Sequence, residues 1–452
     1  MRRDSLLLTL ALACALAACG GPDYLSTAEL MDPETCKTCH QTHYDQWSGS
    51  MHAYAADDPV FVAMNARGQA ATNGALGSFC INCHAPMAVK LGLTTDGTNV
   101  ATLPKYAKGV TCYFCHQVDE IIDDHNNALH LADDGVMRGG ISNPVDSPAH
   151  AAASSPLHDG SARDSSRMCG SCHDVVTPAG VHIERTFAEW KGTIFGHDDP
   201  RTFLSCGTCH MFAKDGVVAD VPDVAVPFRT LGLHEHTFGG IDAALTPWPQ
   251  MAEQRAAIQR DLDPAVVAKI CVTPVNGDQI ELTLDNRGVG HQWPSGAAHD
   301  RRAWVEVIAY DDSDQPIFSS GAVADGQDPE DLSATDPNLW RLGDDVVDAN
   351  NKPVKFFWEV ASYTANTLKA AVTIDPSDPA FYHASNRVYP IPGKRALIKR
   401  LTVRLRIRPL PFALMQDLVD GGELDPAVPG QLPTYELGAA VREWKRGDPL
   451  CI

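Results

Sequence analysis

Positive charge is scarce in this chain, and long apolar runs are absent after its first twenty residues. The 452 residues contain 36 Lys and Arg against 57 Asp and Glu, a formal net charge of −21 at pH 7. Such a chain has little with which to neutralise phosphates, which argues against a nucleic-acid partner. No segment after residue 19 is apolar for long enough to cross a bilayer. The negative charge favours solubility and suits a basic partner.

The N-terminal residues have the pattern of an export signal. Arg2 and Arg3 precede an apolar stretch from Leu6 to Ala18, which is too short for a membrane span. The segment that ends at Cys19 resembles the lipobox of bacterial lipoproteins, in which the cysteine is acylated. We therefore expect a signal peptide over residues 1–19 and a lipid anchor on Cys19; ordinary cleavage that leaves a spare cysteine is the alternative. Gly20, where retained inner-membrane lipoproteins usually have Asp, favours the outer membrane, on its periplasmic or external face.

Five copies of Cys-x-x-Cys-His lie in the first half of the chain. Each is the attachment signature of a c-type haem, in which two sulfurs bind the vinyl groups and the histidine ligates the iron. Disulfides or zinc ribbons would not require a histidine after every cysteine pair. The sequence predicts five haem c groups, attached at Cys36 and Cys39, Cys80 and Cys83, Cys112 and Cys115, Cys169 and Cys172, and Cys206 and Cys209, with proximal ligands His40, His84, His116, His173 and His210.

Two cysteines remain outside the leader and the haem motifs. In an oxidising compartment Cys271 and Cys451 are expected to form one disulfide, which would join the first strand of the C-terminal half to the last residues. Two buried free thiols are the alternative.

The pattern of the chain changes near residue 246. Residues 24–245 lack long periodic helices, as expected when macrocycles fill the core, and we expect a cytochrome domain of short helices and loops. Residues 246–270 form a connector with a helix over 250–260. Residues 271–452 alternate with period two in several runs, which predicts a β-sandwich-like domain of roughly seven strands. The fold class is therefore α+β, and the strands are expected at 279–284, 304–310, 317–318, 356–360, 371–374 and 398–408, with a turn at 311–315 and a closing helix at 435–445.

Thirteen of the 18 histidines lie outside the haem motifs, and at most five can be distal iron ligands. His52 follows the first motif at a distance that suits a short helix, with Met51 as a possible substitute ligand. His150 and His158 are eight residues apart and could reach different haems. His234 and His236 alternate, so one of them faces inward, and His291 lies in a turn-rich loop. The residues alone do not pair any of them with a particular haem.

Several stretches resemble the multihaem cytochrome c-554 family. They are the run from Cys36 through Trp47, His52 and Asp58 to Phe61, the run from Cys169 to Trp190, and Cys206 to Met211; the stretch from Asn286 to Trp304 resembles the β domain of some multihaem cytochromes. The resemblance implies electron transfer through closely packed haems with two histidines on most or all irons. It implies the distal ligands His52, His150, His158, His236 and His291, with His125, His130 and His234 as the main substitutes.

Three functions remain open at this stage. The preferred one is a relay of electrons between redox proteins, or to an extracellular acceptor, by a protein held at the bacterial cell envelope through its lipid. The second is a haem enzyme of the nitrite- or hydroxylamine-converting type, which needs one iron with an open position. No motif ends in the Lys found at the catalytic haem of pentahaem nitrite reductase, which counts against that reaction. The third is a subunit of a cytochrome assembly.

Overall fold

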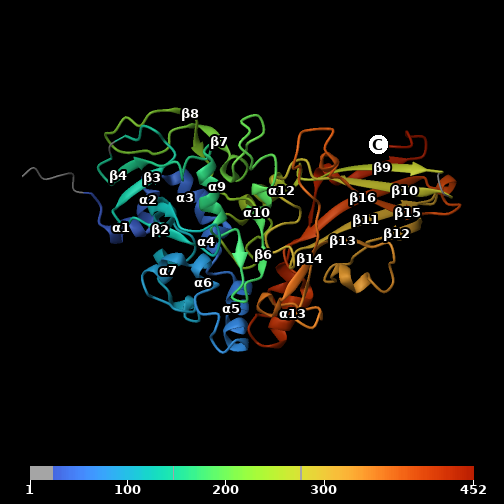
Figure 1. Cartoon of the computed structure of the whole chain (residues 1–452), viewed down its shortest axis with the longest axis horizontal. Helices are drawn as coiled ribbons and strands as arrows, with labels where there is room; N and C mark the ends of the chain where they lie inside the picture. Colours follow the sequence, from blue (N-terminus) through green and yellow to red (C-terminus); the bar gives the residue numbers. More distant parts are fainter. Residues whose placement is uncertain (1–23, 146, 275–276) are drawn as a thin grey trace, which may run out of the picture.

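The computed structural model describes residues 24–145, 147–274 and 277–452. Figure 1 shows a half built of short helices and loops beside a half built of sheets, with the C-terminus at the sheet end. The α+β fold class is confirmed. The predicted signal peptide over residues 1–19 and the lipid site at Cys19 lie outside the described residues.

The first half is built of short helices, several of which begin at a polar side chain that caps them. Thr111 and Ser205 each stand directly before a haem-motif cysteine and accept a backbone N–H at the start of a helix. Asp58 caps α5, and Pro59 supplies its first residue. The helices are α1 Thr27–Met31, α2 Pro33–Lys37, α3 Gln41–Ser48, α4 Met51–Tyr54, α5 Pro59–Ala71, α6 Ile81–His84, α7 Pro86–Lys90, α8 Cys112–Gln117, α9 Arg163–Gly170, α10 Thr186–Lys191 and α11 Cys206–His210.

Four two-stranded ribbons lie between these helices. Three are antiparallel, and the β3–β4 pair is parallel. They are β1 Val118–Ile121 with β2 Leu129–Leu131, β3 Val136–Gly139 with β4 Ala151–Ser154, β5 Val175–Val176 with β6 His182–Glu184, and β7 Ala213–Gly216 with β8 Arg229–His234.

Helix α12, Met251–Leu262, lies in the segment expected to connect the two halves. Its Gln254 side chain donates to the carbonyl of Gly49 and accepts from the backbone N–H of Ala244, at 2.8 Å each. The helix is thereby fastened to the turn between α3 and α4.

The second half contains two sheets that enclose one apolar core. The three-stranded sheet has the order β15–β10–β9, and the larger sheet has the order β14–β13–β11–β16–β17, with β12 on β11 and β18 on β16. Alternate residues of β9, β10, β11 and β16 point into the core between the sheets. The strands are β9 Val267–Thr273, β10 Gln279–Asp285, β11 Arg302–Tyr310, β12 Pro316–Ser320, β13 Trp340–Val347, β14 Ser362–Asn366, β15 Ser385–Pro390, β16 Arg400–Arg408, β17 Tyr435–Glu436 and β18 Arg442–Lys445.

Three expectations about secondary structure in this half are wrong. Residues 356–360 contain the 3₁₀ turn Phe357–Glu359 in place of a strand, and residues 371–374 form no strand. The expected helix over 435–445 is replaced by β17, a short turn and β18, because the edge of β16 offers backbone hydrogen-bonding groups that this segment satisfies. Helix α13, Phe412–Asp420, was not expected.

The last residues of the chain return to β9. Cys271 and Cys451 form a disulfide across a β-bridge, with Cα atoms 3.9 Å apart. Ile270 and Ile452 exchange backbone hydrogen bonds of 2.9 and 2.8 Å on the same line.

The two halves are joined by α13, which packs on α5 (Figure 1). Met415 and Leu418 of α13 share an apolar cluster with Val60 and Ala63 of α5. Beside this cluster the Arg67 guanidinium donates to both carboxylate oxygens of Glu423, at 2.7 and 2.6 Å. Among the described helices, none combines the length and apolar character that a membrane span requires.

Candidate functional site

A single helical turn explains the geometry of the Cys-x-x-Cys-His motifs. Residues three and four positions apart lie on one face of a helix, so both cysteines and the histidine face the same side. The third and fifth motifs are carried by α8 and α11, and α6 carries the second after Cys80. The first motif spans the junction of α2 and α3, and the fourth begins at the end of α9.

Four of the motif histidines are oriented by hydrogen bonds from Nδ1 to backbone carbonyls. His40 donates to Val218, His84 to Ala55, and His210 to Gly239, over 2.9, 2.9 and 2.7 Å. His116 donates in the same way to Arg138. This bond leaves Nε2 free to bind a metal and fixes the plane of the ring, as expected of a proximal ligand.

Two pairs of histidine rings face one another at a separation that suits an iron between them. Two imidazoles on opposite sides of one metal have ring centres roughly 6 Å apart, because each metal–nitrogen bond is about 2 Å. The rings of His40 and His150 are 6.3 Å apart, and those of His52 and His173 are 6.2 Å apart. His52 thus lies opposite the fourth motif although it follows the first in sequence.

His116 has two neighbours of this kind. His236 lies 6.4 Å away with nearly parallel rings, and His158 lies 5.6 Å away. The Nδ1 atom of His236 donates to His234, which leaves its Nε2 free, whereas the Nε2 atom of His158 donates to Cys115. His158 keeps its buried Nδ1 atom without a partner, so each of the two predicted ligands has one free ring nitrogen, Nε2 in His236 and Nδ1 in His158. His234 donates from Nδ1 to Met211.

Among the described residues, no histidine ring is paired with His84 or His210 at a separation of this kind. The Phe61 ring stacks on the imidazole of His84, with the two ring centres 3.9 Å apart. The pKa of His291 is lowered to about 4, first by burial and then by the nearby rings of His210 and His173. Because His173 already faces His52, His210 is the motif histidine left for His291.

Burial keeps these imidazoles neutral. It lowers the pKa of His52 to about 3 and that of His158 to about 4, with neighbouring histidines adding to the effect. The pKa of His236 is also lowered, first by burial and then by His43. A neutral imidazole is the form that ligates a metal, so burial keeps His52, His158 and His236 in the form that a ligand needs at neutral pH.

Cysteines of different motifs are neighbours in the fold. Cys36 and Cys112 lie close enough to affect one another's pKa, and Cys83 lies close enough to Cys172 to raise its pKa. Cys169 and Cys206 are neighbours in the same sense. Cys115 also raises the pKa of Cys169 and Cys172. Motif one is therefore a neighbour of motif three, motif two of motif four, and motif four of motif five, and motif three lies near motif four.

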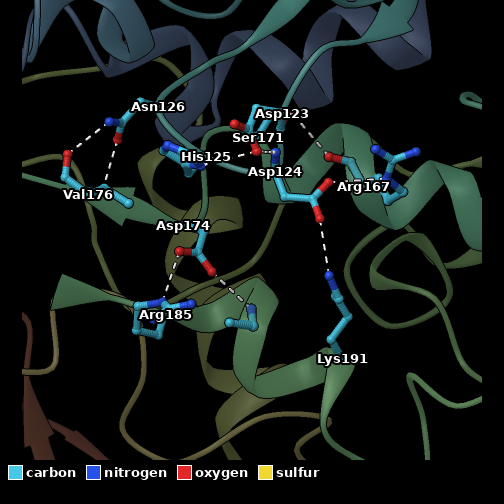
Figure 2. A network of polar contacts seen from close by, with 11 residues as sticks. Asp123, Asp124, His125, Asn126, Arg167, Ser171, Asp174, Val176, Arg185 and Lys191 are labelled. Carbon is cyan, nitrogen blue, oxygen red and sulfur yellow. Dashed lines mark hydrogen bonds and ion pairs between the residues drawn. The ribbon is translucent and has the colours of Figure 1, made fainter. Parts of the chain in front are cut away.

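The loop that follows β1 holds three of these motifs in place. Figure 2 shows Asp124 between Arg167 and Lys191, and Asn126 bonded to Val176. Asn126 also accepts a hydrogen bond from Asn82, inside the second motif, over 3.1 Å. The loop thus ties the second and fourth motifs to the strand that leaves the third.

The residues present fit haem c. The ten motif cysteines carry no disulfide, and the paired histidines would supply nitrogen donors to the iron. No cluster of three or more metal-binding side chains occurs in the part of the chain that the structure describes.

Sequence reasoning gave His43 no role. It lies one helical turn after His40, T-shaped against His236 at 4.7 Å, and its pKa is lowered to about 4, mainly by burial. Its spacing of three residues from a motif histidine was a usable signal, since such residues share a helix face.

The fold and these centres define a multihaem c-type cytochrome. Residues 35–117, which contain the first three motifs, match the family model described as cytochrome c554 and c-prime. The structure is similar to the crystal structure of a penta-heme cytochrome c552 from Thermochromatium tepidum, with a TM-score of 0.61 and 20% identity over 91% of this chain and 98% of that one. A search of curated proteins found no match. The family match over residues 35–117 and the shared fold confirm the resemblance to the cytochrome c554 family that the sequence predicted.

Proposed function

We propose that this chain binds five haem c groups and relays electrons at the bacterial cell envelope. The observation that carries the proposal is that cysteines of different motifs are close neighbours: Cys36 of Cys112, Cys172 of Cys83, and Cys169 of Cys206. Centres attached at neighbouring cysteines would lie close enough for electrons to pass from one to the next. The proposed axial pairs are His40 with His150, His52 with His173, His116 with His236, and His210 with His291.

In this proposal two histidines hold each of four centres in one coordination state. A haem iron between two histidines exchanges one electron with little ligand rearrangement. The carbonyls that accept from Nδ1 fix the proximal rings, and burial sets the local polarity on which reduction potential depends.

A haem count and a spin-state spectrum test the relay. Pyridine haemochrome analysis of the purified holoprotein is expected to give five haems per chain. Electron paramagnetic resonance of the oxidised protein is expected to be dominated by low-spin iron. Fewer than five haems, or mostly high-spin iron, would contradict the relay as proposed.

The partners and the location are part of the same proposal. A formal net charge of −21 suits a basic redox protein as donor or acceptor, with an extracellular acceptor as the alternative. The lipobox-like segment supports an acylated Cys19 and attachment to the outer membrane. Mass spectrometry of the mature N-terminal peptide and membrane fractionation of a Cys19→Ser variant test the anchor, which is excluded if the peptide carries no acyl group.

One observation favours a second function, that of a haem enzyme. His84 has Phe61 stacked against it and, in the described residues, no histidine opposite. An iron at this motif with one axial ligand would have a position open to a small substrate such as nitrite, hydroxylamine or peroxide. A high-spin signal equal to one haem per chain, together with turnover of one of these compounds, is expected from the enzyme; a wholly low-spin spectrum excludes it.

A further inference from the structure

The loop that contains His291 has a shape determined largely by its own half of the molecule. The Asn286 side chain donates to the carbonyl of His291 over 2.9 Å, and His291 Nδ1 donates to Gln292 over 2.7 Å. Trp293 exchanges backbone hydrogen bonds of 3.0 and 2.7 Å with Leu368. These bonds define the loop but do not attach it to the haem-bearing half.

The attachment to the haem-bearing half is made at α10. One carboxylate oxygen of Glu189 accepts from the Ser295 hydroxyl over 2.6 Å and from the Gln292 backbone N–H over 3.2 Å. Thr186, on the same helix, is 2.8 Å from the Ser295 hydroxyl. Thr193, just beyond the helix, donates to the carbonyl of Gly290 over 3.2 Å. The contacts therefore bracket His291 on both sides.

Helix α10 is itself fixed to the fourth haem motif. Asp174, which directly follows His173, accepts from the backbone N–H of Ala188 over 3.0 Å and from the Arg185 side chain over 2.9 Å (Figure 2). Lys191, at the end of the helix, reaches Asp124. A continuous series of hydrogen bonds thus runs from the fourth motif through α10 to the loop.

Burying the Glu189 carboxylate at this place costs free energy. Burial raises the pKa of its carboxyl to about 7, although two donors point at it. An apolar or smaller residue would avoid that cost but would leave the Ser295 hydroxyl and the Gln292 N–H without their acceptor, and a buried unpaired donor destabilises its surroundings. A buried carboxylate at this position is explained if holding the loop in place matters more than the free energy that its burial costs.

We propose that Glu189 is a positioning residue, which holds the β-domain loop so that His291 reaches the iron of the fifth haem. This inference rests on the proposed function, in which His291 is an axial ligand. The β domain is then part of the redox machinery, and the contact between the halves controls the coordination of one haem.

The test uses the holoprotein and counts haems that bind carbon monoxide after reduction, alongside the spin-state spectrum of the oxidised protein. His291→Ala is expected to add one carbon monoxide-binding haem per chain relative to the parent. Glu189→Ala is expected to add a fraction of one such haem, and added imidazole is expected to compete for it. Glu189→Gln is expected to behave as the parent, because its amide oxygen can accept the same two hydrogen bonds.

Glu253→Ala is the control, since Glu253 is exposed on α12. If Glu189→Ala binds no more carbon monoxide than the parent while His291→Ala does, Glu189 does not position the ligand. If His291→Ala also equals the parent, His291 is not a ligand, and the axial assignment fails with the inference. If Glu189→Ala loses haem, the fold has been damaged, and Ser295→Ala replaces it: no rise in carbon monoxide binding by that variant would also overturn the positioning role.

Discussion

Replacing Asp344 with Asn is expected to stabilise the sheet half at neutral pH. Asp344 points inward from β13 and is 8% exposed, and its Oδ1 atom has no hydrogen-bond partner among the described residues. Burial raises the pKa of this carboxyl from 3.8 to about 6; Asp345 adds to the rise, while His299 and the backbone N–H of Asn366 oppose it. An uncharged Asn of the same shape would remove the cost of the buried charge.

The size of the stabilisation by Asp344→Asn, and the pH range over which it develops, follow from the raised pKa of Asp344. About two pKa units at about 1.4 kcal/mol each correspond to about 3 kcal/mol. Below pH 4 the carboxyl is protonated in both the folded and the unfolded chain, so the substitution has little effect there. Between pH 4 and 6 only the folded chain keeps the proton, and the wild type loses stability as the pH rises. The advantage of Asp344→Asn should therefore grow from near zero at pH 4 to about 3 kcal/mol at pH 7 and above.

The assay is urea unfolding of the holoprotein from pH 4 to 8, followed by the circular dichroism of the strands. Asp345→Asn is the matched control, because Asp345 is the next residue of β13, points outward with its side chain 53% exposed, and pairs with Arg341. Loss of this surface ion pair should cost less than about 1 kcal/mol. If Asp344→Asn destabilises the protein at pH 7, or if its effect does not change with pH, the carboxylate has a favourable partner and the reasoning is refuted.

Three further predictions concern the disulfide, a glycine and an axial histidine. The double variant Cys271→Ser with Cys451→Ser opens a loop spanning 180 residues, and its free energy of unfolding in urea should fall by up to about 5 kcal/mol. Its haem spectrum should not change. An unchanged unfolding midpoint would mean that the β-bridge alone closes the loop. Gly109→Ala places a methyl group 2.5 Å from the carbonyl oxygen of His52, at a residue whose φ is +69°. The variant should therefore have a lower thermal unfolding midpoint than Gly92→Ala, because Gly92 has a similar φ but open space around it. Equal midpoints for the two variants would contradict this prediction. His150→Ala should convert one low-spin haem to high-spin in the resonance spectrum, whereas His130→Ala, half exposed and paired with Asp119, should not; identical spectra would remove His150 from the ligands.

The local patterns of the sequence predicted the parts of the structure that local forces determine. The alternation over residues 279–284 and 304–310 produced β10 and β11, because alternate side chains of a strand face one core. The common face of the motif cysteines and histidine likewise follows from local spacing, since one helical turn defines it.

What the sequence did not predict depends on contacts between distant residues. Residues 435–445 have a helix-forming composition, yet they pair with β16, whose free edge exists only in the folded sheet. His52 lies 12 residues after His40 but faces His173, because the chain folds back between the first and fourth motifs. No periodicity encodes such a pairing, which is why the sequence predicts candidate distal ligands but does not match them to their haems.

The neighbouring cysteines also limit how such a chain can be shortened. The first motif lies beside the third and the second beside the fourth, so the two pairs are interleaved along the sequence. Every cut between the first and fourth motifs separates at least one neighbouring pair. A truncated chain with two or three motifs would therefore lose neighbours that no remaining segment replaces. Loss or gain of a whole motif is expected to be tolerated best at the fifth motif, whose Cys206 is a neighbour of the fourth motif.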